Sequence, residues 1–107
     1  MKVEIEVLKS RPRIAFKLDR DSVCAADDCE SHVASVETYS FTNPSALAQE
    51  LSSGYLPFVA GFGHWWECIL IITVIAKVFS DGKAEKIAEV CYVDDNSVYF
   101  KYHSAAF

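Results

Sequence analysis

Lysine and arginine are missing from the middle of this chain of 107 residues: none occurs between Arg20 and Lys77. Six of the ten basic residues lie in the first twenty positions, so the charge is unevenly distributed along the chain. The same basic-free interval holds seven carboxylates, which are Asp21, Asp27, Asp28, Glu30, Glu37, Glu50 and Glu67. If folding gathers some of these acids on one surface, the field of that surface attracts cationic partners and repels nucleic acid and anionic membranes.

Long hydrophobic runs are also lacking. The longest apolar run, from Cys68 to Ala76, is closed on both sides by charged residues and is about half the length of a membrane helix. A secretory signal is not indicated either, because Lys2, Glu4, Glu6 and Lys9 interrupt the apolar positions at the start of the chain. We therefore expect a cytoplasmic protein that does not bind membranes.

The composition indicates one packed domain that spans residues 1–107. A hydrophobic share of 51% and an aromatic share of 13% are typical of a folded globule and exclude a disordered chain. The formal net charge is −5 and the sequence pI is about 5.0. Such an acidic chain is a poor nucleic-acid binder, because the neutralisation of phosphates requires clustered lysine and arginine.

Residues of the types used in catalytic and metal sites are few. Cys24, Cys29 and His32 are of the types that bind zinc, but their spacing does not match a structural zinc site and a fourth ligand is missing. Cys68 and Cys91 lie in apolar segments and are predicted to be buried small hydrophobes, so that only Cys24 and Cys29 are expected to be accessible. We expect no catalytic residue, no metal and no cofactor.

Alternating apolar residues predict strands over 3–7 and 14–18, joined as a hairpin, and further strands over 36–41 and 98–102. Asn43 followed by Pro44 predicts the start of a helix, since asparagine caps free backbone amides and proline fits the first turn. Leu47 and Leu51 would share one face of this helix, and Gly54 would close it in the left-handed conformation.

The segment from Trp65 to Phe79 is predicted to be one central strand, because nearly all of its residues are apolar. In a strand, Trp65 and Trp66 point to opposite faces, so one is expected in the core and the other at the surface. Asp81 and Gly82 predict a tight turn. The next segment, residues 83–93, fits either a helix or a strand, and the turn-forming residues on both sides favour the strand.

These elements predict an α+β fold in which an antiparallel sheet of about five or six strands carries one main helix on a face. In its small size, acidity and lack of catalytic motifs, the chain resembles the immunity proteins of bacterial toxin systems. That resemblance implies a non-enzymatic, stoichiometric inhibitor that occludes the basic active cleft of a toxin such as a nuclease. The residues expected at the interface are Asp21, Asp27, Asp28, Glu30, Glu37 and either Trp65 or Trp66.

A second function stays open at this point. A small-molecule-binding or enzymatic α+β domain would have a pocket between the helix and the sheet. Its lining would come from aromatic residues near the helix end and the central strand, namely Tyr55, Phe58, Phe62 or Trp66. A deep apolar pocket with convergent polar groups would favour this alternative.

Overall fold

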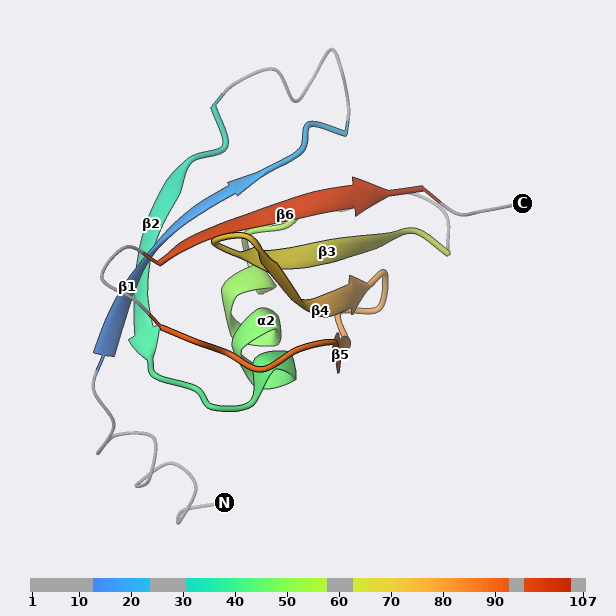
Figure 1. Ribbon diagram of the computed structural model, residues 1–107. Helices are drawn as coiled ribbons and strands as arrows, with labels where there is room; N and C mark the ends of the chain where they lie inside the picture. Colours follow the sequence, from blue (N-terminus) through green and yellow to red (C-terminus); the bar gives the residue numbers. More distant parts are fainter. Residues whose placement is uncertain (1–12, 24–30, 58–62, 93–95, 105–107) are drawn as a thin grey trace.

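The computed structural model of the chain describes residues 13–23, 31–57, 63–92 and 96–104. It has an α+β fold with a six-stranded sheet in the order β2-β1-β6-β3-β4-β5 (Figure 1). All neighbouring strands are antiparallel except β1 and β6, which are parallel. In chain order the elements are β1 (Arg13–Arg20), β2 (Ala34–Tyr39), α2 (Pro44–Ser52), β3 (Trp65–Leu70), β4 (Thr73–Phe79), β5 (Ala84–Lys86) and β6 (Ser97–His103).

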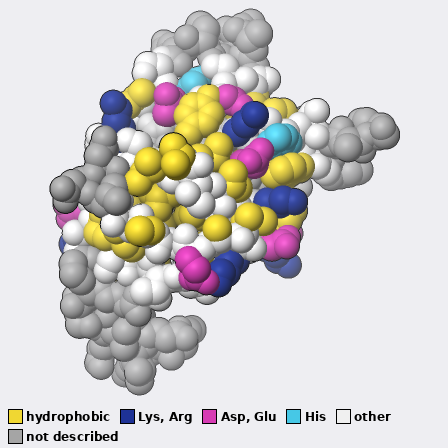
Figure 2. Space-filling view, viewed as in Figure 1, with side chains coloured by type: hydrophobic (Ala, Val, Ile, Leu, Met, Phe, Trp, Pro, Cys, Tyr) yellow, Lys and Arg dark blue, Asp and Glu magenta, His cyan; other side chains and the backbone are white. Residues whose placement is uncertain are grey.

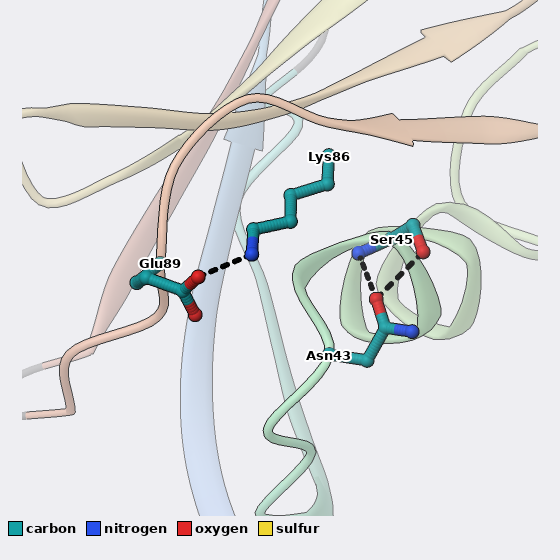
Figure 3. Close-up of polar contacts among 4 residues, drawn as sticks. All are labelled: Asn43, Ser45, Lys86 and Glu89. Carbon is teal, nitrogen blue, oxygen red and sulfur yellow. Dashed lines mark hydrogen bonds and ion pairs between the residues drawn. The ribbon is translucent and has the colours of Figure 1, made fainter.

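The helix α2 begins and ends as the sequence predicts. The side chain of Asn43 accepts hydrogen bonds from the amide and the hydroxyl of Ser45 at 3.0 and 2.7 Å, which caps the free amides of the first turn (Figure 3). Pro44 occupies the first turn, and Gly54 follows the helix with a φ of 73°. Leu47 and Leu51 are both buried against the sheet, where α2 contacts β4 and β5.

The core lies between one face of the sheet and a cover made of α2 and the segment 87–92. Each of four neighbouring strands contributes alternate residues to it, and the buried members are Phe16, Leu18, Trp66, Cys68, Leu70, Ile75, Ala76, Val78, Val98 and Phe100. Tyr92 of the covering segment packs its ring edge against Phe16, with 6.0 Å between the ring centroids. Its hydroxyl also donates a hydrogen bond to the backbone carbonyl of Phe41.

The prediction of a single strand from Trp65 to Phe79 is wrong. The chain reverses at Ile71 and Ile72, so that β3 and β4 form a hairpin in which Leu70 pairs with Thr73. A single strand would continue through Ile72, yet Ile72 is 90% exposed at the tip of the turn. A register shift next to Cys68 then lets two consecutive residues of β4, Ile75 and Ala76, both enter the core.

The remaining strand predictions have mixed outcomes. The strands predicted over 14–18, 36–41 and 98–102 are confirmed as β1, β2 and β6, and the predicted turn is present, with Gly82 at a φ of 88°. Of the predicted segment 83–93, the structure describes residues 83–92, which contain the short strand β5 and, over 87–92, no regular structure. The strand expected over 3–7, and with it the hairpin to β1, lies outside the described residues, within which β1 pairs with β2 and β6.

Candidate functional site

The face of the sheet opposite the core carries no helix within the described ranges, and we call it the open face. Alternation places on it the odd-numbered residues of β1, β2, β3 and β6, together with Val74, Lys77 and Phe79 of β4 and Glu85 of β5. Its two largest features are an apolar patch and a charged row. Figure 2 shows hydrophobic side chains gathered over the β3–β4 turn, with acidic and basic side chains alternating beside them.

The apolar patch consists of Ile69, Ile71, Ile72, Val74 and Tyr99. Ile69 is paired on one side with Val74 and on the other with Tyr99, so the three side chains form one row across β4, β3 and β6. Ile71 and Tyr99 also line the same shallow depression. Their exposed fractions are 44% and 37%, compared with 90% for Ile72. The patch therefore presents large apolar groups to solvent at the β3–β4 turn of the open face.

The β3–β4 turn that carries this patch consists of isoleucines, which are unfavourable in a tight hairpin turn. Ile71 has a φ of 62°, and no other residue except glycine has a positive φ in the described ranges. A β-branched residue is a clear outlier there, because its side chain crowds the backbone, and hairpin turns usually use glycine or asparagine instead. The strained backbone and the exposure of isoleucine side chains each lower the stability of the fold. Such a combination is typical of a segment kept for binding rather than for folding.

The charged row crosses four strands and consists of Lys101, Glu67, Lys77 and Glu85, which are successive cross-strand neighbours. Opposite charges alternate along it, so each residue stands beside an attractive partner. The Glu67 carboxylate also contacts Nε2 of His103. The row accordingly has no net charge and forms a polar border to the apolar patch.

Trp65 lies next to the charged row and is half-buried. The ring of His103 stacks on it, with centroids 4.1 Å apart and planes 10° from parallel, and the Lys77 ammonium lies 4.7 Å from the indole centroid. Trp66 points to the other face and is only 3% exposed, where it packs against Tyr102. The prediction that the two indoles lie on opposite faces is confirmed, and Trp65 is the one available at the surface.

Of the predicted acidic residues, the structure describes Asp21 and Glu37, which make different contacts in the sheet. Asp27, Asp28 and Glu30 lie outside the described residues. Asp21 is held at the end of β1, where its carboxylate accepts hydrogen bonds from the Tyr99 hydroxyl and, at 2.9 Å, from the Tyr102 amide. Glu37 lies on β2 and accepts a hydrogen bond of 2.7 Å from Nε of Arg13.

The described ranges contain eight acidic and seven basic residues, so they account for only −1 of the net charge of −5.

The cysteines differ from their predicted burial in one case. Cys68 is buried as predicted, and this burial raises the pKa of its thiol to about 12, which keeps it protonated and unreactive. Cys91 was predicted to be buried in a strand, but it is exposed because β5 ends at Lys86. His32 shares a 2.8 Å hydrogen bond with the Ser22 hydroxyl, and no cluster of metal-binding residues occurs within the described ranges.

Sequence reasoning missed the apolar patch because it treated residues 65–79 as one strand. Length was the available signal, since fifteen residues is about three times a typical strand.

None of the helices in the described residues is long and apolar enough to cross a membrane. Comparisons with protein-family models, with curated proteins and with solved structures found no match to this chain.

Proposed function

We propose that the protein is a non-enzymatic binding protein that uses the open face to occlude a basic protein partner. The simplest form of this function is the stoichiometric inhibition of a toxin such as a nuclease, as an immunity protein would do. The observation that carries the proposal is the exposed apolar patch at the β3–β4 turn, where Ile72 is 90% exposed and Ile71 has a strained backbone.

The arrangement of the open face suits a protein interface. Interfaces that bind tightly have an apolar centre that excludes water and a polar border that fixes orientation. Ile71, Ile72 and Tyr99 supply apolar groups, while the charged row and Trp65 lie beside them. Large aromatic side chains are frequent hot spots, and Trp65 is already held in place by His103 and Lys77.

The charge of the partner is inferred from the whole chain. The described open face is nearly neutral, but the net charge of −5 creates a long-range field that accelerates encounter with a cationic protein. A basic nuclease has such a surface around its active cleft. Asp27, Asp28 and Glu30 are the residues proposed to contribute most to this attraction, together with Asp21 and Glu37.

The proposal is tested by comparing Ile72→Asp with a control, Val36→Asp, in which another exposed apolar residue is changed on β2, on the core side of the sheet. A partner isolated on the wild-type protein is purified and its affinity is measured. Ile72→Asp should weaken binding about 30-fold, the equivalent of about 2 kcal/mol at a hot spot, whereas Val36→Asp should have little effect. Equal losses for both variants would contradict the use of the open face.

A second arm tests the mode of action. Titration of the partner's activity should reach a sharp endpoint near one-to-one, and the triple change of Asp27, Asp28 and Glu30 to amides should slow association and reduce its salt dependence. Time-dependent inactivation at sub-stoichiometric amounts would show a catalyst instead. The free protein should sediment as a monomer, and a dimer abolished by Ile72→Asp would mean that a second copy covers the open face.

A further inference from the structure

A cavity of about 420 Å³ lies on the core side of the sheet, between the end of α2, the start of β3 and the β4–β5 turn. It is separate from the open face, because Trp66 and Val78, which line it, point to the opposite side of the sheet from Trp65 and Lys77. The alternative function suggested by the sequence placed a pocket in this region with Trp66 in its lining. Tyr55 lines a different, smaller cavity of about 330 Å³, and Phe58 and Phe62 lie outside the described residues.

The lining combines apolar side chains with neutral polar groups. Trp66, Val78 and Leu56 supply apolar surface, and the polar groups come from the amide of Gln49, the hydroxyls of Ser52, Ser53 and Ser80, and the imidazole of His64. No aspartate, glutamate, lysine or arginine lines the cavity among the residues that the structure describes. More of the accessible lining is polar than apolar, so a ligand here is held by hydrogen bonds as well as by apolar contact.

His64 is the strongest indication of a ligand. It is only 8% exposed, and its imidazole makes no hydrogen bond with any residue in the described part of the chain. Its ring lies 6.0 Å from the ring of Tyr102, which in turn packs against Trp66 at 5.1 Å. No side-chain nitrogen or oxygen among the described residues is both buried and without a partner, so the ring nitrogens of His64 are open to solvent, and a hydrogen-bonding group of a ligand in the cavity would replace the water there.

The electrostatics of the cavity select the charge of the ligand. Helix α2 ends at Ser52, and the carbonyl end of a helix carries partial negative charge, which disfavours an anion. A cation would find no carboxylate in the described lining. Some of the carbonyls at this end are already used, since Ser52 accepts hydrogen bonds from the amides of Tyr55 and Leu56 at 3.1 Å.

We propose that this cavity binds an uncharged small organic molecule that has a flat apolar body and a hydrogen-bonding group paired with His64. The apolar body lies against Trp66 and Val78, and the serine hydroxyls offer further hydrogen bonds at the mouth. This site is independent of the binding function proposed for the open face, so either one can fail without the other.

The test uses three probes of nearly the same shape: benzamide, which is neutral, benzoate, which is anionic, and benzamidine, which is cationic. Each is titrated into the full-length, isotope-labelled protein, and binding is followed by the amide and indole NMR signals. Benzamide should give saturable shifts at Trp66, Val78 and Ser53 and should bind about tenfold more tightly than either charged probe. Equal or tighter binding of benzoate or benzamidine, or an absence of saturable shifts at these residues, overturns the proposal.

Variants test whether benzamide binds in the cavity or elsewhere on the protein. Ser80→Phe, at an exposed turn position, should fill the mouth and weaken benzamide binding by about tenfold or more, while the matched control Ser35→Phe on the open face should leave it unchanged. His64→Leu should weaken binding about fivefold, and His64→Gln should restore part of it, because glutamine keeps a hydrogen-bonding group. Unchanged binding in both Ser80→Phe and His64→Leu would show that benzamide binds elsewhere.

Discussion

Asp21, one of the carboxylates in the basic-free interval, stabilises the fold in addition to contributing negative charge. Its amide donates a 3.1 Å hydrogen bond to the carbonyl of Phe100, while its carboxylate accepts hydrogen bonds from Tyr99 and Tyr102. These contacts tie the end of β1 to β6, the only parallel pair among the described strands. Interaction with a partner is therefore not required to explain this carboxylate, and Tyr99 links it directly to the apolar patch.

The hydrogen bond between Tyr99 and Asp21 makes a prediction at the residue scale. It is the main cause that raises the pKa of Tyr99 from 10.0 to about 12, with burial second. The folded protein thus favours the protonated phenol, so this contribution to stability is complete below pH 10.0 and is lost as the pH rises through about 12. Tyr99→Phe should lower the free energy of unfolding by about 1 kcal/mol near neutral pH and by less in strong alkali, as measured by urea unfolding.

A companion variant checks the cause of this shift. Asp21→Asn removes the charge that favours the protonated phenol, so the titration of tyrosinate absorbance should show one group moving to lower pH. If the alkaline midpoints of Asp21→Asn and the wild type coincide, the charge of the Asp21 carboxylate is not the cause of the raised pKa.

At the scale of the elements, the helix and the β3–β4 hairpin show opposite relations between sequence and structure. The ends of α2 use the residues that capping favours, with Asn43 before the helix and Gly54 after it. The hairpin places Ile71 and Ile72 where glycine or asparagine would be more stable. The helix is optimised for folding, whereas the hairpin tip gives up stability in favour of an exposed apolar surface.

The strained turn predicts that a substitution can stabilise the protein. Ile71→Gly removes the crowding at a positive φ, and after the entropy lost by glycine is subtracted the gain should be about 0.5 to 1 kcal/mol, a rise of several degrees in the midpoint of thermal unfolding. Ile87→Gly is the matched control, since Ile87 has an ordinary backbone conformation, and it should give no such gain. A lower midpoint for Ile71→Gly than for the wild type would refute the assignment of strain.

Considered as a whole molecule, the sheet depends on its last strand. β6 is the final strand in the chain but lies inside the sheet, between β1 and β3 (Figure 1). Its residues Val98 and Phe100 are among the most buried in the protein. Without β6 the two halves of the sheet, β2-β1 and β3-β4-β5, would have no hydrogen-bonded connection.

Truncation before Ser97 should therefore prevent folding altogether rather than weaken it in part. The loss of Phe100 alone is expected to cost about 3 to 5 kcal/mol, a large share of the stability of a domain of this size. The truncated chain should show a collapsed amide spectrum and no cooperative unfolding, and addition of a synthetic peptide of residues 97–107 should restore both. Cooperative unfolding of the truncated chain by itself would contradict this role of β6.

The sequence by itself determined the features that depend on neighbouring residues. The cap of α2 at Asn43, the turn at Gly82 and the alternation in β1 and β6 all arise from contacts within a few positions, and each was predicted correctly. The opposite faces of Trp65 and Trp66 followed from the period of a strand. The α+β class followed from these elements together.

Only the tertiary structure decided which distant segments meet. The break at Ile71 runs against local turn preference and is held by long-range contacts, including a 2.8 Å hydrogen bond from its amide to the carbonyl of Ser97. The parallel pairing of β1 with β6 joins segments almost at opposite ends of the chain, and the cavity beside His64 exists because α2 packs against β4. Such arrangements are set by the packing of the whole core, which a local pattern of residues does not encode.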